Sequence, residues 1–84
     1  MWYTYIIKSI NKKWFYVGST NRLEKRLEEH NLGKNISTKA FRPFKYIFIK
    51  NFFIEKEARQ YERKLKDCRK EKEKIISDYL NKNI

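Results

Sequence analysis

The sequence predicts an α+β fold: a small three-stranded antiparallel sheet flanked by helices, in the order β-β-α-β-α-α. Three short segments rich in aromatic and β-branched residues have the composition of strands. The other long segments repeat apolar residues at helical spacing, which is typical of helices packed on one face. With 2 glycines and 1 proline in 84 residues, the few breaks in these patterns indicate the boundaries of the elements.

The length of 84 residues predicts a single domain, residues 1–84. Leu, Ile, Val and Phe fill 22 positions, above the roughly 20% below which chains tend to stay disordered. The single cysteine excludes an internal disulfide, and with one histidine it excludes the usual Cys/His zinc site. No apolar run is long enough for a membrane span, and the first residues do not resemble a signal peptide. We therefore expect an intracellular protein without a membrane partner, cytoplasmic or nucleoid-associated, or nuclear if the source is a eukaryote or its virus.

The first two strands are expected to form a hairpin. Residues 2–8 and 14–18 are mostly aromatic or β-branched, and the polar residues 9–13 between them form the turn. A third strand is expected over 44–53. Its aromatic residues alternate, which predicts that they share one face: Phe44, Tyr46 and Phe48.

The first helix is expected at about 22–32. Asn21 followed by Glu24 fits a capping box with Asn21 as the N-cap, and Gly33 is a suitable C-terminal stop. The polar and basic stretch 33–43 then has the composition of a loop.

From Glu55 onward the pattern is helical without a breaker. Apolar residues recur at helical spacing and predict a stripe that faces the core: Ile54, Ala58, Tyr61, Leu65 and Cys68. Cys68 is therefore interpreted as a small core residue. The stripe moves to a new face near 67–69, so either one helix bends there or a second helix begins.

Charge gives the first indication of a partner. Lys and Arg number 21 against 10 Asp and Glu, a net charge of +11 that is spread over both halves of the chain. A folded domain with this imbalance repels itself unless a polyanion lies nearby, so nucleic acid is the first partner to consider. A merely solubilising surface is the alternative.

Several segments, in order, resemble a GIY-YIG nuclease domain of the small stand-alone type, like the bacterial single-domain members and the nuclease half of Slx-type resolvases. The resemblance covers most of the chain and is carried by residues 3–9, 15–26, 30–34, 42–45 and 57–66. The first triplet is Tyr3-Thr4-Tyr5 and lacks the leading glycine, as stand-alone members often do. The second is Tyr16-Val17-Gly18. The family's asparagine near the C-terminal end has no clear counterpart.

The resemblance implies roles for five residues. Tyr5 and Tyr16 match the two triplet tyrosines, and Arg26 matches the catalytic arginine. His30 falls on a position held by His or Tyr. Glu62 matches the single glutamate that ligates the metal; its structural alternative is a salt bridge to Arg26.

These residue types suit the hydrolysis of a phosphodiester, which needs an activated water and stabilisation of phosphoryl charge. Glu62 can hold one Mg²⁺ or Mn²⁺, and the fork of Arg26 can clamp the scissile phosphate. Ionising a phenol at pH 7 is roughly 4 kcal/mol uphill, and His30 is an easier base. We expect Tyr16 to accept the proton of the water, with Tyr5 and His30 orienting or relaying. The assignment among these three stays open.

Further phosphate contacts are expected at a strand glycine and in the basic loop: Gly18, Lys34, Ser37, Thr38, Lys39 and Arg42. The chain is too short for a separate base-reading module. The resemblance therefore implies a structure-selective DNA endonuclease, acting on branched or flapped DNA in repair or recombination, with any further specificity supplied by a protein partner.

The alternative function is a non-catalytic, basic nucleic-acid-binding module, either a degenerate nuclease or a ribosomal-protein-like domain. Both functions predict the net charge of +11. Tyr5, Tyr16, Arg26 and Glu62 separate them, because a pure binding module has no need for a carboxylate among phosphate-binding cations.

Overall fold

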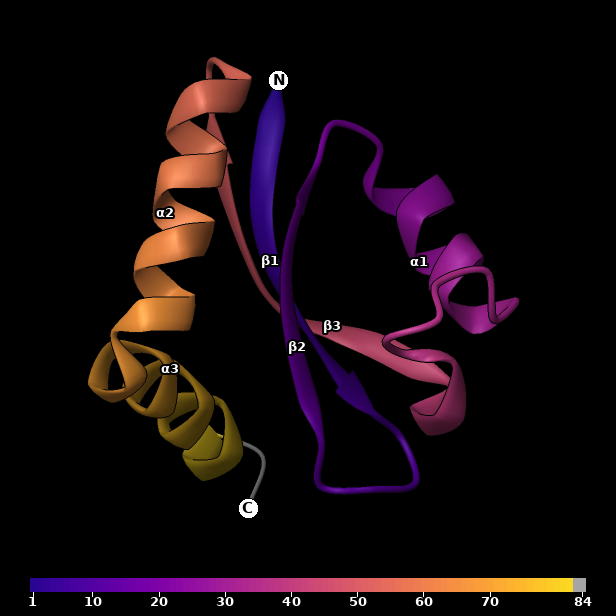
Figure 1. Ribbon diagram of the computed structural model, residues 1–84. Helices are drawn as coiled ribbons and strands as arrows, with labels where there is room; N and C mark the ends of the chain where they lie inside the picture. Colours follow the sequence, from indigo (N-terminus) through magenta and orange to yellow (C-terminus); the bar gives the residue numbers. More distant parts are fainter. Residues whose placement is uncertain (83–84) are drawn as a thin grey trace.

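The computed structural model describes residues 1–82 and confirms the predicted fold class. Strands β1 (Trp2–Ser9), β2 (Phe15–Thr20) and β3 (Phe44–Phe52) form one antiparallel sheet, with β1 in the centre. Helix α1 (Leu23–Asn31) covers one face of the sheet, and helices α2 (Glu55–Asp67) and α3 (Arg69–Lys82) cover the other (Figure 1). A short 3₁₀ helix, Lys39–Phe41, interrupts the loop before β3.

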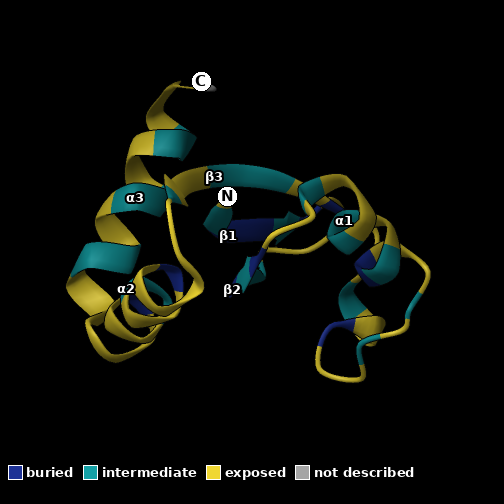
Figure 2. Cartoon of the chain, turned by 90° about the horizontal axis from the view of Figure 1, so that it is seen from above, coloured by how far each residue is buried: buried dark blue, intermediate teal, exposed yellow. Residues whose placement is uncertain are grey.

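The core is divided between the two faces of the sheet, because successive side chains of β1 point in opposite directions. Tyr5 and Ile7 lie in the cluster on the α1 side. Ile6 lies in the cluster on the α2 side, where it packs with Val17 and Leu65. The central strand is accordingly the most deeply buried element (Figure 2). None of the helices within residues 1–82 is long and apolar enough to cross a membrane.

Strand β3 departs from the predicted alternation. Ile6 pairs with Phe48 and Ile7 pairs with Tyr46, which leaves Ile47 as the extra residue of a β-bulge. Tyr46 therefore packs on the α1 side of the sheet and Phe48 on the α2 side. The prediction that the alternating aromatic residues share one face is wrong for Phe48.

The start of α1 also differs from the prediction. The residue at the N-cap is Arg22, and no side chain caps the helix there, so the expected capping role of Asn21 is wrong. The backbone N–H of Arg22 instead donates to the hydroxyl of Thr20 at 3.1 Å. This bond closes the turn between β2 and α1.

The end of α1 confirms the stop expected at Gly33. Gly33 has φ of +78°, a conformation that favours glycine. The N–H groups of Gly33 and Lys34 donate to the carbonyls of His30 and Glu29, each at 3.1 Å, which is a Schellman motif. This turn fixes the last residues of α1 over the sheet.

The C-terminal region contains two helices, because α2 ends at Asp67 and α3 begins at Arg69. Ala58 and Leu65 are buried as the apolar stripe predicts. Cys68 lies between the helices in a non-helical conformation and is exposed, so its interpretation as a core residue is wrong. The break in the helix turns its side chain away from the stripe.

Candidate active site

Four of the five predicted catalytic residues line one polar cavity of about 410 Å³. They come from four different elements: Tyr5 on β1, Tyr16 on β2, Arg26 on α1 and Glu62 on α2. Because β2 is an edge strand, the cavity can wrap around it and receive side chains from both faces of the sheet. The fold therefore brings together residues that lie up to 57 positions apart in the sequence.

Tyr5 is the most deeply buried member of this group, with 0% of its surface exposed. Its hydroxyl lies 3.0 Å from Nε2 of His30 and accepts a hydrogen bond from Nε of Arg26 at 3.4 Å. Burial raises the pKa of Tyr5 to about 12, although the hydrogen bond and the charge of Arg26 oppose this shift. Tyr5 is therefore a phenol that keeps its proton at neutral pH and shares it within a hydrogen-bond network.

Gly18 has a steric reason to be glycine. It pairs with Tyr5 across the β1–β2 ladder, and a Cβ at this position would overlap the Tyr5 hydroxyl. Gly18 also lines the cavity. The glycine of the second triplet, Gly18, thus leaves room for the hydroxyl of Tyr5 in the first triplet.

His30 lies behind Tyr5 and is not among the described residues that line the cavity. It is completely buried. Burial lowers the pKa of His30 to about 4, and the positive charge of Arg26 adds to this effect. The ring is therefore neutral at pH 7. It contacts the cavity residues Tyr5, through a hydrogen bond, and Tyr16, whose ring centroid lies 5.5 Å from its own.

The free energy of unfolding should depend on the protonation of His30. The unfolded chain takes up the proton near pH 6.5 and the folded chain near pH 4, so the stabilisation is complete above 6.5 and is lost as the pH falls toward 4. We expect a loss of about 2 kcal/mol between about pH 7.5 and pH 5, measured by urea unfolding. The His30→Gln variant should lack this component. An identical pH dependence in both proteins would contradict the assignment.

Arg26 presents its guanidinium at the cavity wall, with 32% of its side chain exposed. Besides the bond to Tyr5, it forms an ion pair with Glu29 at 3.4 Å. The salt bridge between Arg26 and Glu62, which was the structural alternative for Glu62, is not formed. Glu62 has other partners.

Glu62 is held at the cavity by two polar contacts. Its Oε1 accepts a hydrogen bond from the Ser19 hydroxyl at 2.5 Å, and its Oε2 pairs with Nζ of Lys66 at 2.7 Å. Its side chain is 17% exposed. The described residues contain no group of three or more His, Cys, Asp or Glu that could hold a metal by themselves. One carboxylate beside a hydroxyl fits a Mg²⁺-like ion that takes its other ligands from water and substrate phosphate.

Tyr16 lies half-buried in the cavity wall. Its ring stacks on Trp14, with centroids 6.2 Å apart, and Trp14 stacks in turn on Phe41 at 4.1 Å. Nζ of Lys66 lies 5.6 Å from the Tyr16 ring centroid. These contacts fix the orientation of the tyrosine.

The basic loop lies away from the cavity that the predicted catalytic residues line. Lys34, Ser37, Lys39 and Arg42 are exposed, and none of them is among the described residues that line the cavity. Thr38 is completely buried, so the expectation that it contacts phosphate is wrong.

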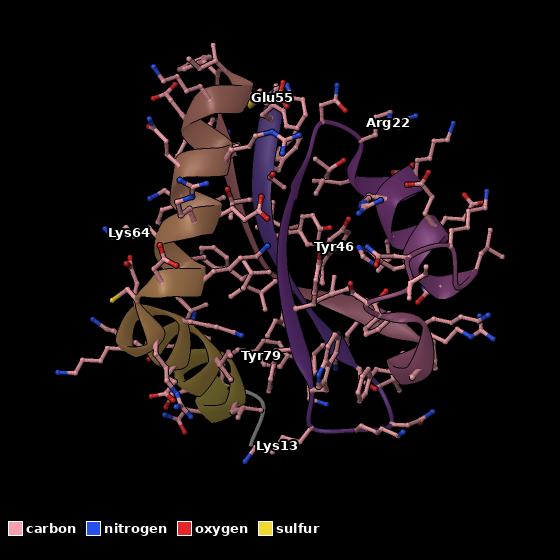
Figure 3. All side chains as sticks on the ribbon, viewed as in Figure 1. Lys13, Arg22, Tyr46, Glu55, Lys64 and Tyr79 are labelled. Carbon is pink, nitrogen blue, oxygen red and sulfur yellow. The ribbon has the colours of Figure 1, made fainter. Side chains whose placement is uncertain are left out.

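Sequence reasoning missed several residues of the cavity: Trp2, Ser19, Arg22 and Arg59. Arg59 precedes Glu62 by three positions and Arg22 precedes Arg26 by four, so helical spacing could have indicated both. Arg22 projects at the start of α1 (Figure 3). Trp2 and Ser19 carry no such signal, because only the pairing of the strands places them there.

Comparison with known proteins adds a family match. The profile described as the GIY-YIG catalytic domain matches residues 1–75. The UPF0213 protein YazA of Bacillus subtilis is 40% identical over 79 residues, covering 92% of this chain and 79% of that protein. The UPF0213 protein OB0043 of Oceanobacillus iheyensis is 38% identical over 76 residues, covering 88% and 87%. A UPF0213 protein of Streptococcus pneumoniae is 35% identical over 72 residues, covering 83% and 73%. No solved structure matches the chain significantly.

Proposed function

Because the chain belongs to the GIY-YIG catalytic domain family, we propose that residues 1–84 form a metal-dependent endonuclease domain that hydrolyses DNA phosphodiester bonds. The observation that carries this proposal is the convergence of Tyr5, Tyr16, Arg26 and Glu62 on one polar cavity. A module that only binds nucleic acid gains nothing from a carboxylate placed among cations that would meet phosphate. The net charge of +11 supports a polyanionic substrate.

Arg26 is proposed to clamp the scissile phosphate. Its guanidinium is planar and carries several N–H donors, so it can bind two phosphate oxygens at once. Arg22 and Arg59 line the same cavity and would neutralise neighbouring phosphates. Glu29 and Glu62 line the cavity too, and Arg26 and Arg59 are ion-paired with Glu29 and Glu55. The three arginines would therefore act as individual hydrogen-bond donors to the developing charge of the transition state.

Glu62 would hold one divalent ion, Mg²⁺ or Mn²⁺, beside the hydroxyl of Ser19. When bound, such an ion supplies Lewis-acid assistance to the leaving oxygen. Lys66, which pairs with Glu62, compensates the carboxylate charge in the protein alone. The pair has i, i+4 spacing and its lysine is 47% exposed, so it is a weak interaction that a divalent ion can replace.

Tyr16 is proposed to accept the proton of the attacking water. It lies in the cavity wall and is more exposed than Tyr5. Tyr5, whose pKa is raised to about 12 by burial, orients the phosphate and the water through its bond to Arg26. His30 supports Tyr5 from behind and acts through it.

We propose that the preferred substrate is branched or flapped DNA, recognised by its structure. The exposed cations of the loop, Lys34, Lys39 and Arg42, can contact phosphates away from the cut. A protein partner would supply any additional specificity, and repair or recombination would be the process served. Because the relatives are bacterial, we expect the protein to act on DNA in the cytoplasm or at the nucleoid.

The test of the proposed function is a cleavage assay with linear, branched and flapped DNA in Mg²⁺, Mn²⁺ or EDTA. We expect cleavage in either metal and none in EDTA. Binding without cleavage of any of these substrates in either metal would favour the non-catalytic binding module instead.

Affinity for DNA should fall steeply with salt. Each phosphate contact contributes a slope of about −0.9 on a double-logarithmic plot, so about four contacts weaken binding roughly 100-fold between about 50 and 200 mM salt. The measurement is fluorescence anisotropy in EDTA, which prevents cleavage. Replacement of Lys34 or Lys39 by alanine should reduce the slope by about one, and replacement of Lys74 on α3 should leave it unchanged. Affinity that stays flat with salt would contradict a phosphate-binding surface.

A further inference from the structure

Thr38 is a buried hydroxyl in an exposed loop. It has 0% of its surface exposed, whereas both neighbours, Ser37 and Lys39, are exposed. Burying a hydroxyl is costly unless its hydrogen bonds are replaced. The contacts of Thr38 therefore indicate what the loop is built to hold.

The partner of Thr38 is the imidazole of His30. Its Oγ1 lies 2.9 Å from Nδ1 of His30 and 3.4 Å from the backbone carbonyl oxygen of Asn35. A carbonyl oxygen can only accept, so in the contact with Asn35 the Thr38 hydroxyl is the donor. The same carbonyl oxygen also accepts from the backbone N–H groups of Thr38 at 3.2 Å and Lys39 at 3.0 Å. The Thr38 oxygen is then free to accept a proton from Nδ1 of His30.

This arrangement determines which nitrogen of His30 carries the proton. The ring is neutral at pH 7, because burial lowers the pKa of His30 to about 4. A neutral ring protonated at Nδ1 has its lone pair at Nε2, which faces the Tyr5 hydroxyl at 3.0 Å. Tyr5 then donates to His30 and accepts from Arg26, whose Nε lies at 3.4 Å.

The opposite tautomer satisfies fewer groups. With the proton on Nε2, Tyr5 would accept from both His30 and Arg26, and its own proton would have no acceptor among these groups. Thr38 would have to turn its proton from the Asn35 carbonyl to His30. If every hydrogen bond runs from donor to acceptor in one direction, from Arg26 through Tyr5, His30 and Thr38 to Asn35, each hydroxyl and ring N–H in the chain has an acceptor.

We propose that Thr38 is a positioning residue that holds His30 in the Nδ1–H tautomer, so that the Tyr5 hydroxyl directs its proton toward His30 and its oxygen toward Arg26 and the cavity. The tautomer is a property of the folded protein. Only the effect on cleavage rests on the proposed nuclease function. Thr38 would thus act through two residues on a cavity that it does not touch.

The test uses the fact that the chain contains 1 histidine, so its ring nitrogens give unambiguous signals in long-range ¹H–¹⁵N NMR spectra. Thr38→Val keeps the shape of the side chain and removes the hydroxyl, whereas Thr38→Ser keeps the hydroxyl. Ser37→Ala removes the neighbouring exposed hydroxyl and is the matched control. At pH 7 we expect the Nδ1–H tautomer in the wild type, in Thr38→Ser and in Ser37→Ala. We expect the Nε2–H tautomer to become the major form in Thr38→Val.

Cleavage kinetics provide the second readout. Thr38→Val should lower kcat by about tenfold and leave KM unchanged, and Thr38→Ser should restore most of the rate. A wild-type protein with the Nε2–H tautomer would overturn the proposal, even if Thr38→Val did not fold. A folded Thr38→Val variant that keeps the Nδ1–H tautomer would also overturn it. If the wild type never cleaves DNA, the nuclease function fails while the NMR result still decides the role of Thr38.

Discussion

DNA cleavage by the Glu62→Gln variant should fall by a factor on the order of 100 or more, while the fold and DNA binding are retained. Glutamine keeps the size of the side chain and can still accept the hydrogen bond of Ser19. It lacks the negative charge that a hard divalent ion needs. Binding should be as tight as in the wild type or tighter, because one negative charge facing the phosphate is removed.

The structural contribution of Glu62 is expected to be small. Its ion pair with Lys66 has i, i+4 spacing on a helix surface, and such pairs contribute about 0.3–0.5 kcal/mol. Glu57→Gln is the matched control, since Glu57 lies exposed on α2 and is not among the described residues lining the cavity. Wild-type cleavage by Glu62→Gln in Mg²⁺ would contradict the role of Glu62 as metal ligand.

Arg26→Ala should lower turnover by a factor on the order of 1,000, measured under single-turnover conditions. The folded state should be little affected, because Arg26 lies on the surface of α1 and a third of its side chain is exposed. Arg26→Lys should recover little of the rate, because an ammonium cannot bind two phosphate oxygens in the plane of a guanidinium fork.

The neighbouring Lys25 provides the control for a general loss of positive charge. It is exposed on the same helix, and Lys25→Ala should weaken DNA binding slightly without changing the rate of the bound complex. If Arg26→Lys cleaves at the wild-type rate, the proposed role of Arg26 as a two-point phosphate clamp is wrong, and the arginine acts only through its charge.

Short-range sequence patterns predicted the strands and the helix ends, because these features depend on neighbouring residues. The strand at residues 2–8, predicted from its aromatic and β-branched composition, and the end of α1 before Gly33 are such features. The bulge at Ile47 depends on the register between β1 and β3, which the alternation within one strand does not contain. Cys68 was misplaced because a helical pattern was extended across the break that follows Asp67.

For the site, spacing that resembles the family was enough to select the four cavity residues Tyr5, Tyr16, Arg26 and Glu62, but it could not indicate their partners. Thr38 is one threonine in a polar loop, and nothing in the neighbouring sequence signals that it is buried. Its burial depends on His30, eight positions earlier, and on the turn that ends α1. Contacts of this kind arise only when separate elements pack together.

Single-turnover cleavage of one DNA substrate in Mg²⁺, by the wild type and by Tyr16→Phe, Arg26→Ala and Glu62→Gln, tests the central claim most directly. We predict cleavage by the wild type that EDTA abolishes, a loss of about 100-fold or more in each variant, and DNA affinity within a few-fold of the wild type throughout. Folded, DNA-bound wild-type protein that leaves the substrate intact would contradict the account, as would variants that cleave at the wild-type rate.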